Sequence, residues 1–310
     1  VFGGRPFRRS AALAAGVVTR RDLDKSFRRV FPGVYMLAAA EMTASSRVRA
    51  AWLWAPSGSV ICGFAAAVLH GERFFAAEVV SGPVEILCPS RPSAPPGVRV
   101  RVARRMGPGT SGHMVEGVAV TSPARTAVDL LRWVDDDDAA IAATDSLCRV
   151  TRTPLPEVAA TALGVRPAHG VRRALERLSK CDPRSESPPE TRLRLACARH
   201  GVPAPELQLE VRDESGRPVA TADLGYRWAR VALFYDGREF HRGEQADYDA
   251  YATARMVELT WDVMRITDRM LAAEESLMRQ IRGALRRQIE RGVGAGSPEL
   301  AALGDSWRSW

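Results

Sequence analysis

The side chains with the clearest capacity for chemistry lie in the segment VALFYDGREFH, residues 231–241. A mostly apolar run ends in Asp236, and His241 closes the segment. Carboxylate oxygens are the ligands that hard divalent cations prefer, and an imidazole can act as a general acid or base near neutral pH. A buried strand that carries both groups at its carboxyl end therefore predicts a metal site. Phe234 departs from this pattern, because it stands where a second acid is expected.

Two further acids are predicted to join this site. In an antiparallel sheet, Asp223 near the end of one strand lies beside Asp236 at the end of the next, and the preceding helix adds Glu190. Mg²⁺ or Mn²⁺ suits such oxygen ligands, and a cation held there would polarise a phosphate and lower the pKa of a bound water. The alternative is that Asp236 with Gly237 forms only a turn and that Asp223 pairs with an arginine.

The elements that must position these acids follow a segment rich in proline and serine, CDPRSESPPE, which predicts a domain boundary. Their order is helix, three strands, helix, strand and helix. The predicted ranges are 189–200, 207–212, 218–226, 230–235, 244–259, 261–266 and 270–290. The last helix is amphipathic, with an apolar face opposite an arginine-rich one. This order predicts an α/β domain with a central mixed sheet.

Residues 184–290 resemble the PD-(D/E)XK nuclease superfamily, in the branch related to Vsr (very-short-patch-repair) endonucleases. The resemblance is carried by the segments SPPETRLRL (187–195), ATADLGY (220–226), VALFYDGREFH (231–241) and WDVMRI (261–266). It implies a restriction-endonuclease-like domain over 183–291. Such a domain would hydrolyse DNA phosphodiester bonds with Mg²⁺ or Mn²⁺ as its cofactor.

The same resemblance implies roles for particular residues of this sequence. The implied metal ligands are Asp223, Asp236 and the backbone carbonyl of Tyr235. The implied catalytic set is Asp223, Asp236, His241 and Glu190.

The sequence also departs from the superfamily at this site. Relatives of the domain usually carry an acid where Phe234 stands, although Vsr enzymes resemble a pattern with Phe there. Where Vsr enzymes carry a further histidine, this chain has Asp236. No superfamily lysine stands in its usual place, and Arg238 is a poor base because it stays protonated. These departures leave two hypotheses open, an active nuclease and a degenerate one.

Residues 1–40 are basic, with eight arginines or lysines against two acids, and their pattern is typical of a compressed winged helix. Helices are predicted over 10–15 and 20–25, with Thr19 as the N-cap of the second. The alternating segment FRRVFPGVYML, residues 27–37, predicts a hairpin with its turn at Pro-Gly. The side chains predicted to contact DNA are Arg20, Arg21, Arg28 and Arg29.

The N-terminal half resembles the AbiEi-type antitoxin and transcriptional-regulator family. The resemblance is carried by GVVTRRDLDKSFRRVFPGVYML, SVICGFAAAVLHG and VAVTSPARTAVDLL. It implies a winged helix that binds DNA, often to repress its own promoter, and a cognate toxin as a possible partner. One helix of the usual winged helix is expected to be lacking before Phe7.

Residues 41–182 predict an α/β middle region. Helices are expected over 43–55 and about 60–70, and the segment TSPARTAVDLL starts a helix with Arg125 and Asp129 one turn apart. The last residues, 292–310, are rich in glycine, serine and alanine and predict a flexible tail. The whole chain is therefore expected to be a multi-domain protein of the α/β (α+β) class.

Composition bounds the classes of function. A net charge of +8 and a pI of about 9.8 favour a polyanionic partner such as DNA. The five cysteines are odd in number and contain no CxxC pair, which favours reduced thiols in a cytoplasm over a zinc ribbon or disulfide scaffold. The apolar runs are far shorter than the ~20 residues of a membrane span, so no membrane partner is expected.

Three functions remain open. The first is a metal-dependent DNA endonuclease in DNA repair or phage defence, with the N-terminal half choosing the DNA. The second is a regulator or antitoxin of the AbiEi type whose nuclease-like domain is catalytically degenerate. The third is a protein-interaction role for the basic C-terminal helix. Fold alone does not choose among these functions.

Overall fold

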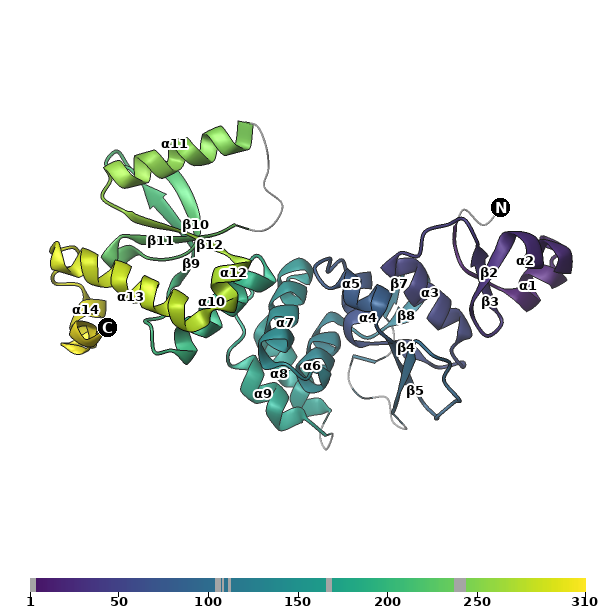
Figure 1. Cartoon of the computed structure of the whole chain (residues 1–310). Coiled ribbons are helices and arrows are strands. Elements are labelled where there is room, and N and C mark those ends of the chain that lie inside the picture. Colours follow the sequence, from purple (N-terminus) through teal and green to yellow (C-terminus); the bar gives the residue numbers. More distant parts are fainter. Residues whose placement is uncertain (1–3, 104–106, 108, 111–112, 166–168, 237–243) are drawn as a thin grey trace. The chain divides into compact units, whose positions relative to one another are not determined.

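The computed structural model describes residues 4–103, 107, 109–110, 113–165, 169–236 and 244–310, with the backbone alone over 244–249. Helices and mixed sheets alternate along the chain, so the α+β multi-domain class predicted from the sequence is confirmed. The chain divides into two compact units, Val1–Cys181 and Asp182–Trp310 (Figure 1). The regions predicted over 1–40 and, to within one residue, 41–182 thus form one unit, called the N-terminal unit here, and the region predicted over 183–291 lies in the other, the C-terminal unit.

The first elements of the N-terminal unit form a small subdomain with its own core. They are β1 (Phe7–Arg8), α1 (Arg9–Ala14), α2 (Arg20–Ser26), β2 (Phe27–Phe31) and β3 (Val34–Leu37). The strands pair antiparallel in the order β1-β3-β2, and Gly33 turns the hairpin with a φ of 74°. Four buried apolar side chains make the core, Phe7, Ala12, Val18 and Leu23. The predicted helix pair and hairpin are therefore present.

Thr19 caps α2, as the sequence predicts, and forms a reciprocal capping box with Asp22. The Thr19 hydroxyl accepts a hydrogen bond from the Asp22 backbone N–H at 3.1 Å, and the Asp22 carboxylate accepts one from the Thr19 N–H at 2.8 Å. We expect Thr19→Ala to lower the free energy of unfolding by about 1 kcal/mol, measured by urea denaturation followed by circular dichroism. Thr19→Asn keeps a good cap and serves as the control; an equal loss in that variant would contradict a capping role.

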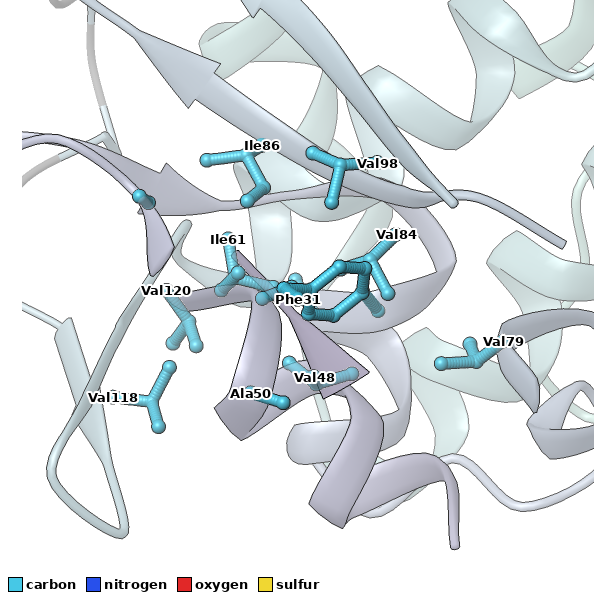
Figure 2. Close-up of a cluster of buried hydrophobic side chains, with 14 of the residues drawn as sticks. Phe31, Val48, Ala50, Ile61, Val79, Val84, Ile86, Val98, Val118 and Val120 are labelled. Carbon is cyan, nitrogen blue, oxygen red and sulfur yellow. The ribbon is translucent and has the colours of Figure 1, made fainter. Parts of the chain in front are cut away.

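A mixed sheet with the strand order β6-β5-β4-β8-β7 forms the centre of the N-terminal unit. Its strands are β4 (Val60–Ile61), β5 (Val84–Cys88), β6 (Val98–Val102), β7 (His113–Val115) and β8 (Val118–Val120). The helices α3 (Ala44–Trp54), α4 (Gly63–Leu69) and α5 (Ala76–Ser81) accompany it. Figure 2 shows Val48 of α3 among apolar strand residues such as Ile61 and Ile86, which is the core of this region.

The segment 60–70 differs from its prediction as a single helix. Val60 and Ile61 form the strand β4, which pairs with β5 and β8, and α4 begins only at Gly63. The apolar run suits both states, and pairing on both sides of β4 decides between them, because a central strand buries both faces.

A helical bundle completes the N-terminal unit. It contains α6 (Pro123–Trp133), α7 (Asp137–Thr151), α8 (Leu155–Gly164) and α9 (Val171–Leu178). Ser122 caps α6 by accepting a hydrogen bond from the Arg125 backbone N–H, and a proline occupies the first turn, which is the predicted helix start. Buried alanines and leucines on α6 and α7 form the bundle core.

The C-terminal unit has the predicted order of helix, three strands, helix, strand and helix, except that two helices stand in place of the single helix predicted over 270–290. Its main elements are α10 (Pro188–Arg199), β9 (Glu206–Arg212), β10 (Pro218–Tyr226), β11 (Val231–Asp236), α11 (Glu244–Glu258), β12 (Asp262–Thr267), α12 (Asp268–Ala272) and α13 (Glu274–Glu290). A short 3₁₀ turn, Arg227–Ala229, joins β10 to β11. The sheet order is β12-β11-β10-β9; β9, β10 and β11 are antiparallel, and β12 runs parallel to β11.

Helices cover both faces of this sheet (Figure 1). On one face, Met256 of α11 packs against Val211 and Ala232. On the other face, α10 and α13 pack against Leu224 and Leu233. The sheet is thus covered on both faces.

The segment 292–310, expected to be a flexible tail, contains the helix α14 (Pro298–Leu303) and the 3₁₀ turn η2 (Ser306–Ser309). Ser297 caps α14 by accepting a hydrogen bond from the Leu300 backbone N–H. Trp310 packs against the core of the C-terminal unit. The expectation is corrected, because a cap and one aromatic side chain order a segment whose composition alone suggests disorder.

None of the described helices combines the length and apolar character needed to cross a bilayer.

Candidate functional site

The acids singled out by the sequence gather at one end of the C-terminal sheet. Asp223 lies on β10, Asp236 ends β11, and Glu190 stands in the first turn of α10. The antiparallel pairing of β10 with β11 brings Asp223 beside the last residues of β11, where the Tyr235 backbone N–H donates to Asp223 Oδ2 at 2.6 Å. Glu186 contributes a further negative charge that acts on Glu190 and Asp223. We call these four residues the acid cluster.

Glu190 is buried, with 5% of its surface exposed, and both of its carboxylate oxygens accept hydrogen bonds. Oε2 accepts from the Glu186 backbone N–H at 2.7 Å and from Gln208 Nε2 at 3.1 Å, and Oε1 accepts from the Ser187 hydroxyl at 2.8 Å. Burial raises the pKa of Glu190 to about 7, and the nearby charge of Asp223 contributes to the rise. Glu190 thus exchanges a proton near neutral pH.

Asp223 is in a similar electrostatic position. Burial raises its pKa above the ordinary value, and the negative charges of Glu186 and Asp236 add to that effect. The Tyr235 backbone N–H and the Arg265 guanidinium oppose the rise. Asp223 therefore lies within electrostatic reach of both Asp236 and a cationic side chain.

Arg265, on β12, is the residue that the sequence analysis missed. Its Nη1 donates to Asp236 Oδ1 at 3.0 Å, and its Nη2 donates to the Thr253 hydroxyl at 3.1 Å. Its guanidinium carbon lies 4.9 Å from the ring centroid of Phe234, the residue with which it is in register across the parallel strands. One signal for this was available in the sequence. Side chains alternate along the strand VMRI, so Arg265 is expected on the same face of the sheet as Val263.

The remaining predicted site residues have different outcomes. The side-chain hydroxyl of Tyr235 bonds to Asp268, while its backbone N–H bonds to Asp223. His241 and Arg238 lie outside the residues that the structure describes. Within the described ranges, no group of three His, Cys, Asp or Glu side chains converges as a metal site.

The described residues therefore do not fit a divalent cation as they stand. A divalent ion needs oxygens that are free to approach it at about 2.0–2.6 Å. Here Glu190 accepts three hydrogen bonds, one oxygen of Asp223 accepts from Tyr235, and Asp236 is paired with Arg265. Phe234 supplies no side-chain oxygen beside these acids.

The four arginines predicted to contact DNA are all exposed in the N-terminal subdomain. Arg20 and Arg21 occupy the first turn of α2, and Arg28 and Arg29 lie on the adjoining strand β2. Arg28 Nη2 donates to the Ala40 backbone carbonyl at 2.7 Å, which holds that side chain along the hairpin. One helix start and one hairpin strand thus present four guanidiniums to solvent.

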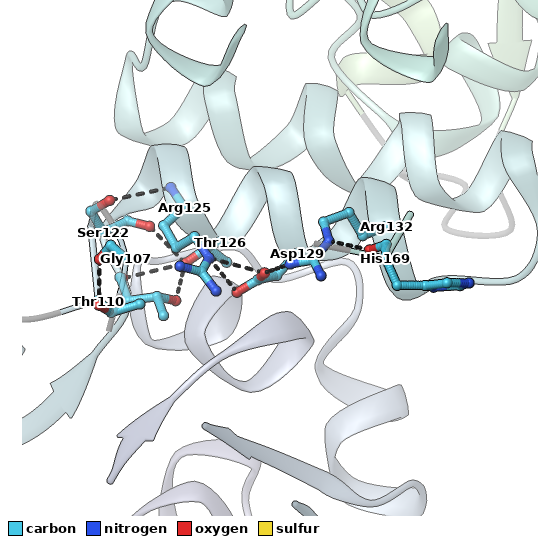
Figure 3. Close-up of polar contacts among 9 residues, drawn as sticks. Gly107, Thr110, Ser122, Arg125, Thr126, Asp129, Arg132 and His169 are labelled. Carbon is cyan, nitrogen blue, oxygen red and sulfur yellow. Dashed lines mark hydrogen bonds and ion pairs between the residues drawn. The ribbon is translucent and has the colours of Figure 1, made fainter. Parts of the chain in front are cut away.

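A second polar constellation lies inside the N-terminal unit (Figure 3). Arg125 Nε donates to both oxygens of Asp129, at 3.0 and 3.1 Å, and Arg132 Nη1 donates to Asp129 Oδ1 at 3.2 Å. Asp129 is fully buried, and the side chains of Arg125 and Arg132 are 6% and 8% exposed. Burial raises the pKa of Asp129 to about 6, while the two arginines oppose the rise. Its enclosure by protein donors indicates a structural role.

The chain is similar to two proteins of Mycobacterium tuberculosis. It is 30% identical over 258 residues to Uncharacterized protein Rv2248 of strain ATCC 25618 / H37Rv, an alignment that covers 80% of this chain and 90% of the relative. The same values hold for Uncharacterized protein MT2308 of strain CDC 1551 / Oshkosh. No family model and no solved structure matches the chain.

Proposed function

The chain belongs to the family of these two mycobacterial proteins, and we propose that it is a DNA-binding regulator of the AbiEi type whose nuclease-like C-terminal unit does not cleave DNA. The observation that carries the DNA-binding proposal is the exposure of Arg20, Arg21, Arg28 and Arg29 on a helix start and the hairpin beside it. A cognate toxin is a further partner that this type of regulator implies.

The arrangement of these arginines suits a DNA backbone. Guanidiniums bind phosphate oxygens through paired N–H donors. These four are exposed, so a phosphate can reach them without a change in the packing of the subdomain. The net charge of +8 favours the same partner at longer range.

The order and pairing of the C-terminal elements support a nuclease-like fold for that unit. Three antiparallel strands after α10, and a fourth strand parallel to β11, agree with what the resemblance to PD-(D/E)XK domains implies. The local chemistry favours the degenerate form of that domain, because Asp236 is bound to Arg265.

Metal-dependent cleavage of DNA in repair or phage defence, with Mg²⁺ or Mn²⁺, is the second candidate. One observation favours it: burial and crowding raise the pKa of Glu190 and Asp223, so a cation would stabilise both carboxylates. This candidate requires Asp236 to exchange Arg265 for the cation.

DNA binding is tested by fluorescence anisotropy with the promoter region upstream of the chain's own gene, at several salt concentrations. We expect Arg20→Ala/Arg21→Ala to weaken binding about tenfold and to reduce the salt slope by about 0.9 per lost phosphate contact. Arg149→Ala/Arg172→Ala removes the same charge from exposed helical positions elsewhere in the unit and should leave affinity nearly unchanged. Equal losses in both variants would indicate only general charge attraction.

Cleavage is tested with the same protein and plasmid DNA in Mg²⁺ or Mn²⁺. We expect the DNA to stay intact with the wild type and with Asp223→Ala alike. Cleavage that disappears in Asp223→Ala would support the second candidate instead.

A further inference from the structure

We propose that the guanidinium of Arg265 is the built-in counter-ion of the acid cluster and occupies the role that a divalent cation plays in an active nuclease of this fold. The inference deepens the proposed function, since it rests on the nuclease-like architecture of the C-terminal unit. The positive charge at this site is then supplied by a side chain of the protein and not by a bound ion.

Three contacts fix the position of Arg265. One edge of the guanidinium bonds to Asp236 at 3.0 Å, and the other bonds to Thr253 of α11 at 3.1 Å. The guanidinium carbon lies over the Phe234 ring, 4.9 Å from its centroid. An acid, a hydroxyl and an aromatic ring thus hold this cation beside Asp236.

Phe234 and Arg265 are complementary to each other. Phe234 is partly buried and packs against the apolar cluster that contains Ala232 and Met256. Its ring also accepts the guanidinium, which is attracted to the electron-rich ring face. An acid at position 234 would offer oxygens to a metal, whereas an aromatic ring there offers a surface that suits arginine.

The ion pair of Arg265 with Asp236 compensates one negative charge of the acid cluster. A bound cation would otherwise supply this stabilising effect. Asp236 Oδ1 accepts a hydrogen bond from Arg265, and this bond competes with the binding of a metal ion by the same oxygen.

A simpler role for Arg265 is to tie β12 to α11 without any bearing on metals. The two roles predict different responses to a divalent ion, so metal binding separates them. The matched comparison uses a second arginine of this unit, Arg287, which pairs with Asp262 at 2.7 Å on α13 and β12. Loss of that pair leaves Arg265 in place.

The experiment measures Mn²⁺ binding to chelator-treated full-length protein, without DNA, by calorimetry and by thermal shift. We expect no binding and no shift for the wild type. Phe234→Glu/Arg265→Gln introduces an acid beside Asp236 and removes the counter-ion, so we expect one Mn²⁺ per chain and a rise of about 5 °C in melting temperature with saturating Mn²⁺. Phe234→Glu/Arg287→Gln has the same change in formal charge and should bind at least tenfold more weakly.

Arg265→Gln alone is the second variant, in case the double variant does not fold, and it should show a smaller Mn²⁺-dependent shift than the double variant. The inference is overturned if the wild type binds Mn²⁺ and Asp223→Ala abolishes that binding. It is also overturned if the Arg265 and Arg287 variants bind equally well, or if the folded Arg265 variants bind none. Because no DNA is present, these outcomes are independent of whether the N-terminal arginines bind DNA.

Discussion

Asp129→Ala is expected to destabilise the N-terminal unit by about 3–5 kcal/mol, because it leaves two buried guanidiniums without their carboxylate. Asp129 is fully buried, and it accepts hydrogen bonds from Arg125 at 3.0 and 3.1 Å and from Arg132 at 3.2 Å. Both arginines are nearly enclosed, so water cannot replace the lost charge. Urea denaturation followed by far-ultraviolet circular dichroism measures the change.

The control for this prediction is an exposed ion pair of the same spacing in the same unit. Arg172 and Glu176 are also one turn apart, but their side chains are 91% and 63% exposed. Glu176→Ala should therefore cost only about 0–1 kcal/mol. If both variants lose a similar free energy of unfolding, burial is not the reason why the Asp129 ion pair stabilises the unit.

Glu190→Gln is expected to remove a pH dependence from the stability of the C-terminal unit. The pKa of Glu190 is raised from 4.5 to about 7 in the folded chain, so the folded state binds its proton more tightly than the unfolded state does. Between those two pH values the folded wild type holds the extra proton, and its stability falls as pH rises. The fall amounts to about 3 kcal/mol, at about 1.4 kcal/mol for each unit of pKa difference.

Urea denaturation at about pH 4.5 and pH 8 measures this effect in both proteins. Glutamine cannot accept from all three donors that surround Glu190, so the variant is less stable by the same amount at both pH values. The proton on Glu190 is therefore measured by the difference in the free energy of unfolding between the two pH values. Glu299→Gln removes an exposed carboxylate from the same unit and should leave the pH difference as it is. An unchanged pH difference in Glu190→Gln would place the titrating proton on another group.

Some features of the fold were predicted from the sequence because local interactions decide them. Thr19 caps α2 through a residue three positions away, and Gly33 turns the hairpin through its own backbone freedom. Ser122 likewise starts α6 beside a proline. The order of helices and strands in the C-terminal unit was also predicted locally, from the spacing of apolar residues within each segment.

Other features depend on partners that are distant in the sequence. Val60 and Ile61 continue an apolar pattern that also suits a helix, and they become a strand because β5 and β8 lie on either side. Trp310 orders the end of the chain by packing on a core formed by residues far before it. Composition and spacing carry no information about such pairings.

The sequence by itself singled out three of the four acids of the acid cluster, Glu190, Asp223 and Asp236, which stand on elements that periodicity defines, and the structure added Glu186. Only the tertiary structure decided what those acids bind. The register of β12 against β11 sets Arg265 beside Phe234 and Asp236, and burial in the surrounding core raises the pKa of Glu190. Sheet register and desolvation both arise from packing between distant segments, and for that reason no motif within one segment reveals them.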